Sequence, residues 1–177
     1  NACCQQKMPF FEAMKNKKFA LNNVFGINLH SPPHQAKKYA PKPNLYAFFI
    51  SLGIHSLRQG GVLCYLIPQT LLTATDTDTI RYYLAKEMLI EKIVTFGEKV
   101  FIGRGNKQSN NVITSSMIIV ARRTQAPAEH AVLYQQLEVG SWKIIAEKRV
   151  SQQLLFDNYS NWNFVTQTAF MLQLQER

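Results

Sequence analysis

One stretch of the sequence combines the signals of a helix, a glycine pair and an apolar strand, in that order. From Asn44 to Arg58, apolar residues recur at helical spacing and form two stripes on the same helix. Gly60 and Gly61 then stop the helix, and residues 62–67 are continuously apolar and β-rich up to Pro68. We expect a helix with two apolar stripes to be sandwiched, and a strand without alternation to be buried on both faces of a parallel sheet. The stretch therefore predicts half of a βαβ unit.

The elements on either side extend this α/β pattern. A second helix is expected from Asp76 or Asp78, with an apolar face that reaches Met88. The sequence predicts strands over 93–96, 112–121, 131–136 and 142–146, and a terminal helix from about Phe164. Prolines and lysines limit residues 1–43 to one short helix near 8–18, followed by loop. Segment 97–111, rich in Gly and Asn, predicts an exposed loop.

Composition limits the classes of protein to which this chain can belong. The 177 residues carry a formal net charge of +9, which favours polyanionic partners such as nucleic acid, although a purely solubilising charge is an equal alternative. No apolar run reaches the length of a membrane span, so we expect a soluble protein. The 3 cysteines are odd in number and two of them are adjacent, and the 4 histidines are scattered, which predicts neither a disulfide framework nor a metal site. These features favour a cytoplasmic protein.

Several segments resemble, in their order and in their amino-acid sequence, the adenine-N6 DNA methyltransferases of restriction-modification systems, in particular the type IIG and IIS enzymes. In those enzymes one polypeptide both cleaves and methylates DNA. The resemblance covers about 44–170 and follows the catalytic loop of the family. The segments that carry it are PNLYAFFI at 43–50, LRQGGV at 57–62, LIPQTLL at 66–72, IEKIVTFGEKVF at 90–101, SSMIIV at 115–120 and NWNF at 161–164.

The resemblance implies a partial Rossmann-like methyltransferase sheet, with a parallel strand, a terminal antiparallel hairpin and flanking helices. Residues 62–67 would be the fifth strand of that sheet. S-adenosylmethionine would bind beyond the carboxyl ends of the strands. The implied domains are an irregular Lys- and Pro-rich segment at 1–43, the C-terminal half of the catalytic domain at 44–136, and a linker towards a target-recognition domain at 137–177.

Two motifs of the family are missing, and they constrain the activity of this chain. Neither the glycine-bearing cofactor loop nor the Asn/Asp-Pro-Pro-aromatic catalytic loop occurs in the sequence. The segment most similar to the catalytic loop is Ser31-Pro32-Pro33-His34. It is either a degenerate catalytic loop or a Pro-Pro turn in an insertion. We assign no catalytic residue and no metal ligand.

The resemblance transfers cofactor-binding roles to two residues. Phe49, expected on the inner face of the 44–58 helix, matches an aromatic residue that lines the adenine pocket of S-adenosylmethionine, and Leu45 lies one turn earlier. Packing in the core is the alternative for both side chains.

DNA-binding roles follow in the same way. Phe101 matches an aromatic residue that contacts the flipped base, and core packing is again the alternative. Arg104 and Lys107 would face phosphate, unless they are solvated loop cations. Gln69 and Thr70 follow the carboxyl end of strand 62–67. We expect them near the site, because open α/β sheets bind ligands beyond the carboxyl ends of their strands.

These inferences predict part of a site-specific DNA adenine-N6 methyltransferase. The full-length enzyme, with or without a fused endonuclease, would use S-adenosylmethionine and act on double-stranded DNA with a flipped adenine. The chain alone would be inactive and would not bind the cofactor tightly. The alternative is a non-catalytic DNA-binding module derived from half of a methyltransferase domain.

The strand at 62–67 also predicts self-association. Its edge would lack the fourth strand of the family's sheet, and an unpaired apolar edge favours association. We therefore expect a homodimer of the isolated chain. The alternative is that residues 1–43 fold back over this edge.

Overall fold

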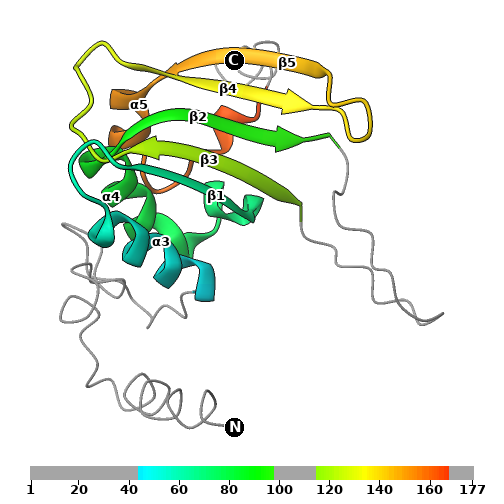
Figure 1. Ribbon diagram of the computed structural model, residues 1–177. Coiled ribbons are helices and arrows are strands. Elements are labelled where there is room, and N and C mark those ends of the chain that lie inside the picture. The colour runs from blue at the N-terminus through cyan, green and yellow to red at the C-terminus, as the bar shows by residue number, and fades with distance from the viewer. Residues whose placement is uncertain (1–43, 98–114, 168–177) are drawn as a thin grey trace, which may run out of the picture.

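A five-stranded mixed sheet forms the centre of the computed structural model, which describes residues 44–97 and 115–167 (Figure 1). The strands lie in the order β1-β3-β2-β4-β5. Their bounds are Val62–Pro68 for β1, Leu89–Phe96 for β2, Ser116–Arg122 for β3, Ala131–Leu137 for β4 and Ile144–Ser151 for β5. The helices are α3 over Leu45–Ser56, α4 over Asp78–Glu87 and α5 over Gln152–Asp157. Single 3₁₀ turns cover Gln69–Leu72, Thr75–Thr77 and Asn163–Val165.

The strand directions place the carboxyl ends of three strands at the same end of the sheet, which is called the carboxyl edge below. β3 is antiparallel to both β1 and β2, β2 is parallel to β4, and β5 is antiparallel to β4. β1, β2 and β4 therefore run the same way, and their carboxyl ends lie together. The insertion of β3 between β1 and β2 confirms the predicted combination of a parallel strand with an antiparallel hairpin.

The core lies between the sheet and the helices α3 and α4, which pack on the same face (Figure 1). Ile50 and Ile54 of α3 are fully buried there, beside Ile93 of β2 and Ile119 of β3. Trp162, from the segment after α5, is also fully buried and joins this core. The sheet and its core thus include residues on both sides of position 136.

The two faces of β1 differ, and the expectation that it is buried on both was wrong. Leu63 and Ile67 are buried beneath α3, whereas Val62, Cys64 and Leu66 are exposed on the opposite face. The residues are all apolar, so the hydrophobic pattern could not show that the described helices cover only one side of this strand.

Helix α3 differs from its prediction for the same reason. Asn44 caps it as expected, because its side chain accepts a hydrogen bond from the Leu45 backbone N–H at 2.7 Å. One stripe of α3, which includes Phe48, Ile50 and Ile54, is buried against the neighbouring elements. The other stripe is exposed, so the expectation of a sandwiched helix was wrong.

Other elements were placed with smaller errors. The start of α4 at Asp78 and the strand that begins at Ala131 were predicted, and residues 62–67 do form a strand. β2 begins four residues earlier than expected, β5 occupies Ile144–Ser151 instead of 142–146, and α5 was not predicted. The short helix expected near 8–18, the loop residues 98–111 and the beginning of strand 112–121 lie outside the described residues.

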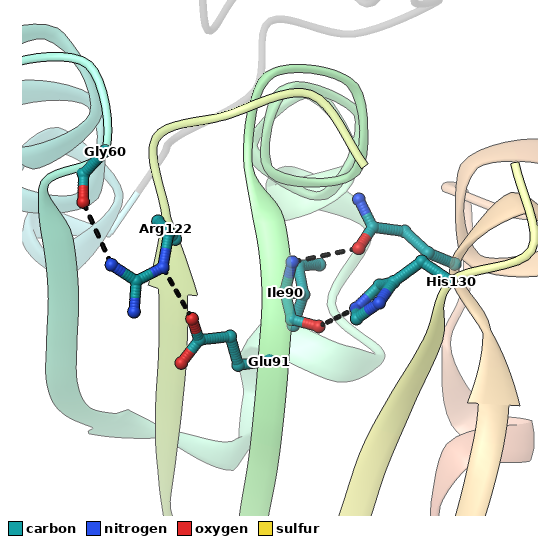
Figure 2. Close-up of polar contacts among 6 residues, drawn as sticks. Gly60, Ile90, Glu91, Arg122 and His130 are labelled. Carbon is teal, nitrogen blue, oxygen red and sulfur yellow. Dashed lines mark hydrogen bonds and ion pairs between the residues drawn. The ribbon is translucent and has the colours of Figure 1, made fainter. Parts of the chain in front are cut away.

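Polar contacts stabilise the irregular start of β2, where the pairing with β3 shifts register between Ile90 and Lys92 (Figure 2). The Ile90 N–H donates to the side chain of Gln152 at 2.9 Å, and the Ile90 carbonyl lies 2.7 Å from Nε2 of His130. On the neighbouring strand, Arg122 forms an ion pair with Glu91 and donates to the Gly60 carbonyl. These bonds hold the amino end of β2, opposite the carboxyl edge.

Candidate functional site

The carboxyl ends of β1 and β2 bring together segments that are distant in the sequence. Gln69 follows β1 directly, and its backbone N–H donates to the Ser115 carbonyl at 2.8 Å. Gly97 follows β2, so Gly97 and Ser115 are the two described residues that flank segment 98–114. This segment therefore leaves and rejoins the sheet at the carboxyl edge, where Gln69 lies, which is where open α/β sheets bind ligands.

A pocket of about 400 Å³ opens beside this edge. One wall is the 3₁₀ turn after β1, the second is the start of β3, and the third is the turn at Asn163–Val165. None of the described residues that line it carries a charged side chain. The lining residues are Gln69, Thr70, Leu72, Thr73, Ser115, Asn163 and Thr166.

Arg81 of α4 holds two of these walls together, although its side chain is fully buried. Its guanidinium donates to the Leu71 and Ala74 carbonyls at 2.7 and 2.9 Å, in the segment after β1. It also donates to the Tyr159 and Ser160 carbonyls at 2.6 and 2.5 Å, just before Trp162. Burial lowers the pKa of Arg81 to about 10, which leaves the guanidinium charged at neutral pH. A single cation thus joins the segment after β1 to residues that lie 78 and 79 positions after Arg81 in the sequence.

Two further contacts fix the same region. The Trp162 backbone N–H donates to the Leu72 carbonyl at 2.7 Å, and its indole N–H donates to the Leu155 carbonyl at 2.8 Å. The hydroxyl of Tyr46, in the first turn of α3, lies 3.4 Å from Oγ1 of Thr70. Burial raises the pKa of the Tyr46 phenol. The pocket walls are therefore anchored to the core as well as to one another.

The structure separates the two groups of predicted site residues. Gln69 and Thr70 line the pocket. Leu45 and Phe49, by contrast, lie on the exposed stripe of α3, with 56% and 54% of their surface exposed. Phe49 is not on the inner face of the helix, and neither side chain is packed in the core. The reason is that the buried stripe, which includes the neighbouring Phe48, already fills the contact with the rest of the fold.

Three predicted DNA-binding residues, Phe101, Arg104 and Lys107, lie outside the described residues, and so does Ser31-Pro32-Pro33-His34. The part of the chain that the structure describes contains no group of three His, Cys, Asp or Glu side chains able to hold a metal ion. Its helices are too short or too polar to cross a membrane.

Besides Leu72 and Thr73, which follow the predicted Gln69 and Thr70, sequence reasoning missed four residues of this region: Arg81, Ser115, Asn163 and Thr166. Arg81 lies beside an apolar helix face, and a pattern of apolar residues does not reveal that an arginine can be buried by bonds to distant carbonyls. The other three come to the pocket only because β1 pairs with β3 and because Trp162 docks in the core.

A family model described as the Eco57I restriction-modification methylase matches residues 10–101, just over half of the chain. The chain belongs to this methylase family. The Type II methyltransferase M.TthHB8I of Thermus thermophilus is 41% identical over 93 residues, which are 52% of this chain and 20% of that protein. The similarity joins this chain to a methyltransferase of a restriction-modification system.

A solved structure of a restriction-modification enzyme shares the fold of this chain. The type IIG restriction endonuclease BpuSI superposes with a TM-score of 0.57 at 14% identity, over 85% of this chain and 19% of that one. A type I methyltransferase subunit from Streptococcus thermophilus gives a TM-score of 0.45 at 16% identity, over 67% of this chain and 29% of that one. The chain spans about a fifth of the length of M.TthHB8I and of BpuSI.

Proposed function

We propose that this chain is part of a site-specific DNA adenine-N6 methyltransferase of a restriction-modification system, dependent on S-adenosylmethionine. Membership of the methylase family carries the proposal. The arrangement of the sheet supports it, because the predicted Gln69 and Thr70 border a pocket at the carboxyl edge, where three parallel strands end. In this proposal, residues 44–136 are the C-terminal half of the catalytic domain, and residues 137–177, of which β5 and Trp162 still pack with that half, lead towards a target-recognition domain.

On the cofactor side, we propose that Leu45 and Phe49 form an apolar wall against the adenine ring of S-adenosylmethionine. An exposed aromatic ring can stack on a purine, so the exposure of Phe49 suits this role. The first turn of α3 has no acidic residue that could hold the ribose hydroxyls. The described residues therefore fit one face of the cofactor only, and the group that donates the methyl must be held by other residues.

On the DNA side, we propose that Phe101 contacts the flipped base while Arg104 and Lys107 contact phosphate. The support is positional, because segment 98–114 starts after Gly97 and ends before Ser115 at the carboxyl edge beside Gln69. The net charge of +9 favours an encounter with DNA. DNA lies in the cytoplasm of a bacterial cell, and we propose this compartment for the protein.

The isolated chain should neither transfer a methyl group nor bind S-adenosylmethionine tightly, since the sequence contains neither the glycine-bearing loop nor the Asn/Asp-Pro-Pro-aromatic loop. Calorimetry should detect no binding at micromolar cofactor. Micromolar affinity would overturn the assignment of the principal cofactor contacts to other residues.

Binding to DNA tests the other half of the proposal. The chain should bind duplex DNA with an affinity that falls steeply as salt rises, because phosphate contacts release counterions. Arg104→Ala/Lys107→Ala should reduce both the affinity and the salt slope. The chain can also be combined with the parts of the proposed methyltransferase that carry the two loops. If it binds DNA but adds nothing to methyl transfer in that combination, the non-catalytic DNA-binding module is the better description.

A further inference from the structure

We propose that the pocket bounded by Gln69, Ser115 and Asn163 binds the edge of a nucleobase in DNA, and so contributes to sequence preference. The inference rests on the proposed function, because that function supplies DNA as the partner. It adds a contact site that joins the segment after β1 to the turn after Trp162, two parts of the chain that the family match does not connect.

The chemistry of the described lining residues suits the edge of a base. The amides of Gln69 and Asn163 each offer a hydrogen-bond donor and an acceptor, and Thr70, Thr73 and Ser115 add hydroxyl groups. Base edges present donors and acceptors side by side, and Asn or Gln can bond to adenine in a bidentate manner. Such side chains can also contact phosphate, but none of the described lining residues adds the cationic side chain that phosphate binding favours.

Access and rigidity also suit recognition of a large ligand. Asn163, Thr70 and Ser115 are exposed and Gln69 is half-buried, so DNA can reach these groups without opening the fold. The volume of about 400 Å³ lies within the range of roughly 300 to 1,000 Å³ that is usual for ligand pockets. The walls that carry the two amides are held at a fixed separation by Arg81, and by the bond from Trp162 to Leu72. A fixed separation matters because a bidentate contact depends on geometry.

The test compares the full chain with Gln69→Ala/Asn163→Ala. A matched control is Gln153→Ala/Asn158→Ala, which removes the same two kinds of exposed amide from α5 and its C-terminal cap. A duplex sequence is first selected from a random pool with the unaltered chain. Fluorescence anisotropy then gives the affinity of each variant for this duplex across a salt series. The measurement is repeated with duplexes in which 7-deazaadenine replaces one adenine at a time, which removes one base acceptor.

We expect the pocket variant to bind the selected duplex roughly tenfold or more weakly, at an unchanged salt slope, and to show a flatter sequence preference. The control should keep the affinity of the unaltered chain. One 7-deazaadenine position should weaken binding by the unaltered chain and have no effect on the pocket variant.

Three results would overturn the inference. A pocket variant with unaltered affinity and preference would remove the pocket as a contact while DNA binding itself stands. A lowered salt slope would show a contact with the backbone instead of a base. If the unaltered chain fails to bind any duplex, the proposed function of this chain fails together with the inference.

Discussion

Arg81 shows how one residue can organise this fold from inside the core. The carbonyls that it contacts belong to turns, where backbone groups lack the partners that a helix or strand supplies. Its hydroxyl partner is Thr77, one turn earlier, at 2.6 Å. The buried guanidinium is tolerated here because these oxygens together solvate its charge, and the Asp78 carboxylate also favours the charged form.

Replacement of Arg81 should therefore be costly. Arg81→Met leaves four carbonyls without this donor and should lower the free energy of unfolding by about 3 kcal/mol. Arg81→Lys retains the charge but cannot span both turns, so it should recover less than half of the loss. Arg149→Met, on an exposed residue of β5, is the control and should change stability by less than about 0.5 kcal/mol. Urea denaturation measures all three, and equal stabilities of Arg81→Met and the control would contradict the role.

At the scale of elements, α5 stabilises the turn between α4 and β2. Its first residue, Gln152, is 3% exposed, and the side-chain amide donates to the Ala85 and Met88 carbonyls at 2.9 and 2.6 Å. The amide oxygen accepts from the Ile90 N–H. One side chain thus satisfies the end of a helix and the start of a strand, which explains why a helix of only 6 residues holds a defined position.

Loss of this contact should destabilise the chain without changing its surface. Gln152→Leu keeps the volume but leaves one N–H and two carbonyls unsatisfied, and we expect a cost of about 2 to 4 kcal/mol. The neighbouring Gln153→Leu changes an exposed residue and should have little effect. The midpoint of urea unfolding measures the difference. Similar midpoints for the two variants would show that α5 is held mainly by its apolar contacts.

At the scale of the whole molecule, β1 is an edge strand of the described sheet. Among the described strands, β1 pairs only with β3. Hydrogen bonds from Gln69 to Ser115 and from Arg123 to Gly61 place the hydrogen-bonded pairs of this ladder on odd-numbered residues of β1. The backbone groups of Val62, Cys64 and Leu66 therefore point away from β3. Pro68 has no N–H and ends this series.

We propose that two copies of the isolated chain pair antiparallel through β1, with Cys64 at the two-fold axis. This register uses the backbone groups of Val62, Cys64 and Leu66 in both copies and leaves Pro68 outside. The two Cys64 Cα atoms would be about 5.5 Å apart, within disulfide range. In a Cys3→Ser/Cys4→Ser background, mild oxidation should give a covalent dimer through the exposed Cys64.

Charged residues on this edge should abolish the association. Val62→Lys/Leu66→Lys should give a monomer in sedimentation, because like charges would meet across the two-fold axis. Ile144→Lys/Ile145→Lys, on exposed apolar residues of β5, should still dimerise. A monodisperse monomer of the unaltered chain would contradict the proposal and favour coverage of the edge by residues 1–43.

The sequence by itself determined the class of fold, the order of most elements and the family, because periodicity, caps, glycines and a linked set of motifs are local signals. It located α4, the strand at 62–67 and the pocket residues Gln69 and Thr70. Only the tertiary structure decided which apolar stripe of α3 is buried, which face of β1 is exposed, and which distant residues complete the pocket. The physical reason is that burial depends on neighbours. Phe48 and Phe49 are identical in hydrophobicity, but one faces the core and the other faces solvent.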